Sequence, residues 1–375
     1  MSNISKVPTR KTHIDILRLI AICCVVYMHI PIATPPPSTT TGYYIYLAIN
    51  MCIRTAIPIF FMISGAVLLH KVEEHSVVIK KRIFHFFIIL ASAIALQILF
   101  GSYIINKQNF LNHLFGYTIN YVKHQNLPYG MPTQWYLYAY LALLIMLPIV
   151  RPAAQGMSNK SHLYLITAYI ITVFIIPTAL FFINAPYHHR IHNHLPFYST
   201  EEWLPNAGMN WLFYALLGYY LEHRIKNNQL TSKKIMLLIG LAIICTFASC
   251  FMMEAVRIKQ EAHQIKDFFF ATKFTVIPAI ALYLTVRYMT MRVTFSKRTS
   301  SLIHHLGRAV IIVFLFENIL RRYSGIPLAK ISDLLPSSGY FEVYILNCLH
   351  ILIVVSAGLI GGIILQYVPG IKRFI

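Results

Sequence analysis

Three ionisable residues lie within one apolar segment near the start of the chain, THIDILRLIAICCVVYMHI. They are Asp15, Arg18 and His29. Arg18 and His29 are separated by ten residues, which in an α-helix places them on one face about three turns and ~16 Å apart. Asp15 precedes Arg18 by three residues, a spacing that allows an ion pair. Buried ionisable groups mark candidate functional sites, and an imidazole can take up a proton near neutral pH. The alternative is that Asp15 and Arg18 anchor the helix at a membrane surface while His29 meets water at its other end.

A second group of basic residues begins the segment KKRIFHFF. It contains Lys80, Lys81, Arg82 and His85. Clustered Lys and Arg side chains suit the oxygens of a phosphorylated ligand. The competing interpretation is a solvated loop whose positive charge sets the orientation of the chain in a membrane.

Several further positions are weaker candidates. In FFMISG, Ser64 and Gly65 permit close approach of two helices, and Trp135 stands where a helix enters from the outer face, a usual place for aromatic residues. Glu317 follows a run of eight apolar residues and precedes Arg321 and Arg322, with which it can pair.

The HHRIHNH stretch and the cysteines are the places where a metal ion could bind. The four histidines of HHRIHNH have no carboxylate or thiolate neighbours at a fixed spacing, and the cysteines form no CxxC or CxxH pair. We therefore expect no metal site.

Composition shows which kind of protein holds these residues. Of the 375 residues, 57% are apolar and only 12% are charged, against roughly 25% charged in soluble domains. These values exclude a soluble globular enzyme, and they also exclude a disordered chain, which would be poor in apolar residues. The net charge of +20 comes from basic residues that lie mostly between apolar runs, so we expect membrane lipids rather than nucleic acid as partner.

The apolar runs predict an all-α polytopic membrane protein with about ten transmembrane helices, since each crossing needs about 20 residues. About 18 basic residues fall on one side of the predicted membrane and about nine on the other, which places both termini in the cytoplasm. No internal repeat or separate soluble domain is visible, so residues 1–375 form a single domain. The predicted spans are 14–32, 43–69, 83–105, 134–152, 162–184, 206–222, 235–254, 268–289, 302–320 and 340–367.

The order of these motifs resembles the integral-membrane acyltransferase-3 family, whose members O-acylate surface carbohydrates. The resemblance rests on D-x-x-R followed by ten residues and His, then FFMISG, KKRIFHFF, QWYLYAYLALLIMLP and LFYALLGYYL, and it extends over nearly the whole chain. Two positions depart from the family pattern. His85 stands where many members have the second Arg of Arg-x-x-Arg, and Phe-Leu-Phe-Glu, ending at Glu317, stands in place of Tyr-Leu-x-His.

The resemblance implies an acyl-CoA donor, usually acetyl-CoA, that approaches from the cytoplasm, and a carbohydrate hydroxyl as acceptor, on a surface glycan or a lipid-linked sugar. His29 would act as general base or acyl acceptor, with Arg18 and Asp15 orienting the donor. Lys81, Arg82 and His85 would contact the CoA phosphates. Ser64, Trp135 and Glu317 would position substrates. No permanently bound cofactor is expected, because a thioester is already activated, and the expected location is the bacterial cytoplasmic (inner) membrane.

Two other classes of membrane protein compete with this interpretation. A transporter or flippase for a lipid-linked sugar would also carry buried Arg and His, but its prolines and glycines should fall into two matched sets, and here they do not. A glycan polymerase or ligase should have a large outer loop rich in Arg, whereas 106–133 offers only Lys107 and Lys123 as basic residues.

Overall fold

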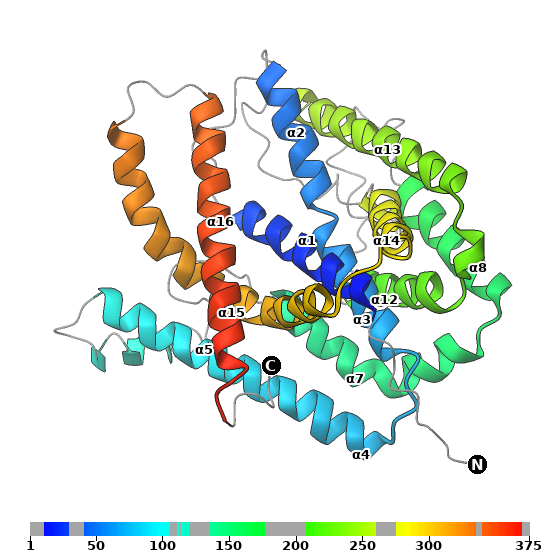
Figure 1. The fold of residues 1–375 in the computed structure, drawn as a ribbon, viewed down its shortest axis with the longest axis horizontal. Helices are drawn as coiled ribbons and strands as arrows, with labels where there is room; N and C mark the ends of the chain where they lie inside the picture. The colour runs from blue at the N-terminus through cyan, green and yellow to red at the C-terminus, as the bar shows by residue number, and fades with distance from the viewer. Residues whose placement is uncertain are drawn as a thin grey trace.

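The computed structural model describes residues 11–29, 41–105, 135–176, 208–259, 275–334 and 340–369, with parts of 111–119. Every regular element in these ranges is a helix, as Figure 1 shows. Two of them, η1 and η2, are π-helices and η4 is a 3₁₀-helix. The elements are α1 (Thr12–His29), α2 (Thr41–Ile53), α3 (Ala56–Leu68), α4 (His75–Val77), η1 (Val78–Ile83), α5 (Phe84–Ile105), α7 (Trp135–Gly156), α8 (Asn159–Tyr169), η2 (Ile170–Ile175), α12 (Gly208–His223), η4 (Asn227–Gln229), α13 (Ser232–Lys259), α14 (Val276–Thr290), α15 (Lys297–Leu334) and α16 (Tyr340–Leu365).

The prediction of an all-α polytopic membrane protein is confirmed. Within the described ranges, seven segments are long and apolar enough to cross a membrane, and α14 is a shorter apolar helix. Each of the ten predicted spans coincides at least in part with a helix, although 177–184 lies outside the described residues. The number of crossings and the side on which the termini lie remain predictions.

One predicted span, 43–69, consists of two helices, which together form one segment that is long and apolar enough to cross a membrane. Helix α2 ends at Ile53 and α3 begins at Ala56, with a turn at Arg54 and Thr55. The Thr55 hydroxyl donates to the carbonyl of Cys52 over 2.7 Å. Pro58 has no N–H group to bond the carbonyl of Arg54, four residues earlier, so one hydrogen bond of a continuous helix would be missing at this point.

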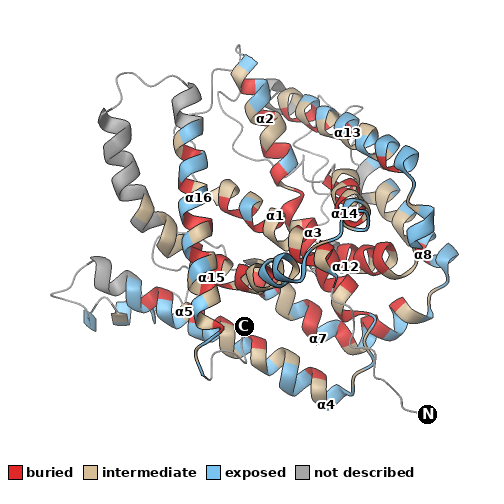
Figure 2. Cartoon of the chain, in the orientation of Figure 1, coloured by how far each residue is buried: buried red, intermediate tan, exposed pale blue. Residues whose placement is uncertain are grey.

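Helix α1 lies in the interior of the bundle, between α3, α14, α15 and α16 (Figure 1). Its side chains Leu17 and Ile22 are completely buried. Figure 2 shows buried residues concentrated on the central helices, whereas the peripheral α13 exposes large apolar side chains such as Leu237 and Phe247. Exposed apolar faces of this kind fit contact with lipid tails rather than with water.

Two glycines bring α3 and α12 into direct backbone contact. A Cβ atom added to Gly65 would lie 1.8 Å from the carbonyl oxygen of Ala215, and one added to Gly218 would lie 1.9 Å from that of Met62. Any larger residue at either position would force the helices apart. The interpretation of FFMISG as a close-packing segment is therefore confirmed at Gly65.

Three arginines bind the carboxyl ends of helices that neighbour their own. Arg151 of α7 donates to the carbonyl of Leu68, the last residue of α3. Arg224, which follows α12, donates to the carbonyls of Gln155 and Met157 at the end of α7, and Arg287 of α14 donates to those of Leu221 and Ile225 at the end of α12. Cations stabilise the carboxyl ends of helices, so these basic residues also tie α3, α7, α12 and α14 together at one end of the bundle. We call this the basic end.

Candidate active site

A cavity of about 390 Å³ opens between α1, α3, α7, α15 and the segment formed by η1 and α5. Most of its wall is apolar or aromatic, and the described residues that line it include no Asp or Glu. The basic side chains that line it are Arg18, Lys81, Arg82, His85 and Arg308. The cavity therefore combines an apolar interior with a positively charged part, a combination that suits an anionic ligand with an uncharged extension.

Five of the nine residues proposed from the sequence line this cavity. They are Arg18, Ser64, Lys81, Arg82 and His85. The last three lie in and just after the π-helix η1, and Lys81 and Arg82 each precede His85 by about one helical turn. π-Helical turns are rare and frequent at functional sites, and here one occurs where the chain presents its basic cluster to the cavity.

Arg82 is hydrogen-bonded to Glu73, a residue that was not predicted from the sequence to belong to the site. The Nη2 atom of Arg82 donates to Glu73 Oε1 over 2.7 Å, and Arg151 Nη2 donates to Glu73 Oε2 over the same distance. The hydrogen bond from Arg82, followed by the one from Arg151, lowers the pKa of the Glu73 carboxyl from 4.5 to about 2. Glu73 is therefore ionised at neutral pH, and it links the cavity wall to the buried Arg151.

The predicted pairing of Asp15 with Arg18 is confirmed, since Arg18 Nη1 donates to Asp15 Oδ1 over 2.9 Å. Asp15 is 2% exposed and does not itself line the cavity. Its second oxygen lies 3.8 Å from His304 Nδ1. Gly307 makes room for this carboxylate, because a Cβ atom there would lie 2.7 Å from Asp15 Oδ1. Asp15 thus holds the Arg18 guanidinium at the cavity wall.

His29 and Glu317 meet at the opposite end of α1. His29 Nδ1 and Glu317 Oε1 are 2.5 Å apart, although their relative direction departs from that of a regular hydrogen bond. Glu317 is 2% exposed, and Arg321 donates to the backbone carbonyl of His29. A carboxylate beside Nδ1 favours the imidazole tautomer that carries its proton there, which leaves Nε2 as the basic nitrogen. Neither residue is among those that line the cavity.

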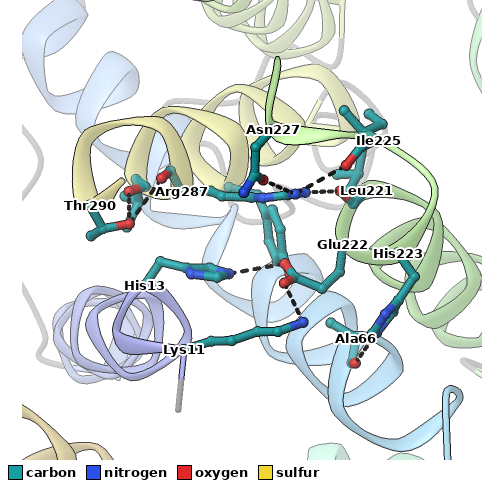
Figure 3. A network of polar contacts seen from close by, with 12 residues as sticks. Lys11, His13, Ala66, Leu221, Glu222, His223, Ile225, Asn227, Arg287 and Thr290 are labelled. Carbon is teal, nitrogen blue, oxygen red and sulfur yellow. Dashed lines mark hydrogen bonds and ion pairs between the residues drawn. The ribbon is translucent and has the colours of Figure 1, made fainter. Parts of the chain in front are cut away.

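The beginning of α1 is fixed by a separate polar network around Glu222 of α12 (Figure 3). Its carboxylate accepts from Lys11 Nζ over 2.7 Å, from His13 Nε2 over 3.0 Å and from the Tyr283 hydroxyl over 2.8 Å. Glu222, His13 and Tyr283 are buried, whereas the Lys11 side chain is exposed. The network connects the beginning of α1 to α12 and α14, and it thereby helps to fix the position of Arg18 on α1. The sequence reasoning did not select Glu222 or His13, although both are ionisable residues at the margin of apolar segments.

Some residues singled out from the sequence cannot be placed. The side chain of Trp135 lies outside the described residues, although Trp135 is the first residue of α7. The HHRIHNH stretch, 188–194, also lies outside them.

Arg308 and Tyr136 line the cavity, and neither was proposed as a site residue. The sequence offered a signal for each of them. Arg308 is a charged residue within an apolar segment, and Tyr136 belongs to an aromatic run at the start of one.

Comparison with known families identifies the family of the chain. The model of the acyltransferase-3 family, described as an acyltransferase domain, matches residues 12–367, which is nearly the whole chain. Comparison with curated proteins and with solved structures gives no significant match. The chain therefore belongs to the acyltransferase-3 family and is a membrane acyltransferase.

Proposed function

We propose that this acyltransferase moves an acetyl group from cytoplasmic acetyl-CoA to a hydroxyl of an envelope carbohydrate, in the cytoplasmic membrane of a bacterium. The acceptor is a surface glycan or a lipid-linked sugar. One observation carries the proposal. The cavity with five basic side chains ends on α15 at Phe314, and Glu317, which contacts His29, follows one helical turn later.

The basic part of the cavity suits the donor. CoA carries phosphate groups, and Arg and Lys side chains bind phosphate oxygens through strong charge-assisted hydrogen bonds. Lys81, Arg82 and Arg308 are the candidates for these contacts, with Arg18 and His85 beside them in the wall. The apolar remainder of the wall suits the uncharged arm that ends in the thioester. No permanently bound cofactor is needed, because the thioester supplies an activated acyl group.

His29 supplies the base in the proposed reaction. A carbohydrate hydroxyl is a weak nucleophile at neutral pH, so Nε2 of His29 takes its proton while the oxygen attacks the thioester carbonyl carbon. The new C–O bond forms, the C–S bond breaks and the thiolate of CoA leaves. The thiolate then receives the proton from the imidazolium, so the products are the acetyl ester and CoA. Glu317 stabilises the imidazolium during this cycle and keeps the ring oriented.

A covalent route uses the same nitrogen. In that route Nε2 attacks the thioester first, and the acetyl group passes from the imidazole to the acceptor hydroxyl. The two routes differ in kinetics, because only the covalent route gives ping-pong behaviour and CoA release before the acceptor binds.

The function is tested on the carbohydrate itself. Envelope polysaccharide from cells with and without the gene is compared by mass, and membranes that contain the protein are incubated with acetyl-CoA labelled in the acetyl group. The proposal predicts a mass difference of one acetyl group per modified sugar and label in the carbohydrate fraction. Identical masses together with unlabelled carbohydrate would overturn it, and transport of an unmodified lipid-linked sugar would support the transporter class instead.

A further inference from the structure

Three aromatic residues lie next to one another in the cavity wall. They are Phe60 of α3, Tyr136 of α7 and Phe314 of α15. Phe60 and Tyr136 are the lining residues of α3 and α7 that lie farthest from the basic end, where Arg151 binds the carbonyl of Leu68, and Phe314 is the last lining residue of α15. The rings touch one another, with centroids 5.7 Å apart for Phe60 and Tyr136 and 5.1 Å apart for Tyr136 and Phe314. We call these three residues the aromatic constriction.

Phe314 relates the constriction to the His29–Glu317 pair. Phe314 precedes Glu317 by three residues on the same helix, which corresponds to about one turn and ~4.5 Å along the axis. Among the described residues, the cavity lining reaches Phe314 but includes neither Glu317 nor His29. Along α15, the part of the cavity wall that holds Phe314 is therefore the part nearest to the carboxylate beside the imidazole.

The constriction is backed by further rings that limit its movement. Tyr136 also contacts Phe61, with ring centroids 5.0 Å apart, and Phe61 stacks on Trp211 at 4.8 Å. Phe61 is completely buried. Because packed interiors accept extra methylene groups only by displacing neighbours, this wall resists a longer acyl chain.

We propose that Phe60, Tyr136 and Phe314 select the acyl group of the donor, admitting an acetyl group and rejecting acyl chains of four or more carbons. This proposal rests on the proposed function, and it assigns the acyl specificity to named side chains. One methylene group in an apolar pocket changes the rate constant of an enzyme for a substrate by roughly 10- to 200-fold. Two added methylene groups are thus enough for strong selection against a butyryl donor.

The test compares a series of thioesters with the full-length protein in membranes. The values of kcat/KM are measured with acetyl-, propionyl-, butyryl- and hexanoyl-CoA for the wild type and for Phe314→Ala. We expect the ratio of the butyryl value to the acetyl value to rise by roughly tenfold or more in Phe314→Ala. Phe316→Ala is the matched control, since Phe316 lies on the same helix, is also partly buried and does not line the cavity. Its ratio should equal that of the wild type.

Two further variants keep the test decisive if Phe314→Ala fails to accumulate. Phe314→Leu should relax the selection in the same direction to a smaller extent. Phe314→Trp should increase the selection against longer acyl chains, so that kcat/KM falls more for propionyl-CoA than for acetyl-CoA. An unchanged ratio in each Phe314 variant that accumulates, or a wild type that uses hexanoyl-CoA as well as acetyl-CoA, would overturn the assignment of selectivity alone. A wild type that transfers no acyl group from any of the four donors would overturn the proposed function, and this proposal with it.

Discussion

Glu317 lies against His29, with its Oε1 atom 2.5 Å from Nδ1 of the imidazole, although the two residues come from opposite ends of the chain. Glu317 is 2% exposed and His29 is partly buried. A carboxylate in this position can hold the orientation of the ring and set its tautomer. The proximity of this pair to the last lining residue of the cavity is the basis for assigning it the chemistry.

Replacing Glu317 by Gln should lower kcat for acetyl transfer by roughly a hundredfold or more, because general base catalysis contributes about 10²- to 10⁴-fold and depends on the correct tautomer. The KM for acetyl-CoA should change little, since Glu317 does not line the cavity. Initial rates at saturating acetyl-CoA measure the effect, with the exposed Glu74→Gln as control. A Glu317→Gln protein with wild-type kcat would show that the carboxylate is not needed to orient the base.

Replacing Arg82 by Ala should raise the KM for acetyl-CoA by roughly 10- to 100-fold, as expected for the loss of a hydrogen bond between charged groups. Acceptor saturation should be unaffected, because Arg82 lies in the basic part of the cavity with Lys81 and His85. Donor titrations in membranes provide the measurement. Arg298→Ala, an exposed basic residue at the start of α15, is the control. Unaltered donor saturation in Arg82→Ala would remove its role at the phosphates.

The ion pairs of Glu73 should give the protein a defined dependence of stability on pH. Hydrogen bonds from Arg82 and Arg151 lower the pKa of this carboxyl to about 2, below its ordinary value of 4.5. Glu73 therefore contributes stability that is complete above pH 4.5 and is lost as the pH falls from there towards 2.

The comparison of wild type with Glu73→Gln in detergent tests this dependence. The difference in Tm between the two proteins should be constant above about pH 5.5 and should shrink progressively below pH 4.5. Glu74→Gln provides the baseline for removal of a neighbouring exposed carboxylate. If the difference in Tm already disappeared between pH 7 and pH 6, a group other than Glu73 would be responsible for the pH dependence.

Gly307→Ala should disturb the site through Asp15. A Cβ atom at this position would lie 2.7 Å from the Asp15 carboxylate, which would have to move and release Arg18. We expect a loss of stability of about 1–3 kcal/mol, typical of overpacking, together with a higher KM for acetyl-CoA. Gly361→Ala is the matched control, because a Cβ atom there meets no other atom within 4 Å. Equal Tm and KM values in the two variants would contradict the positioning role of Asp15.

The sequence was sufficient to predict the features that depend on local spacing or on the cost of burying charge. Asp15 and Arg18 pair as their three-residue spacing predicts, and Arg82 and His85 share a helix face that lines the cavity. The break between α2 and α3 was missed, even though Pro58 marks it.

Contacts between distant segments depend on helix packing, which spacing does not determine. Glu317 was expected to position substrate or to pair with Arg321 and Arg322, whereas the structure places its carboxylate beside His29. The roles of Glu73 and Glu222 were not predicted from the sequence, because they also depend on contacts between distant segments. Their importance comes from partners that other segments bring to them: arginines of η1 and α7 for Glu73, and a lysine and a histidine at the beginning of α1 for Glu222.

The most direct measurement is acetyl transfer by His29→Ala in membranes supplied with labelled acetyl-CoA, beside His75→Ala, which removes an exposed histidine. The wild type and His75→Ala should label the envelope carbohydrate, and His29→Ala should label none while it accumulates in the membrane at the normal level. Labelled carbohydrate from His29→Ala at the wild-type rate would contradict the assignment of His29 to the chemistry.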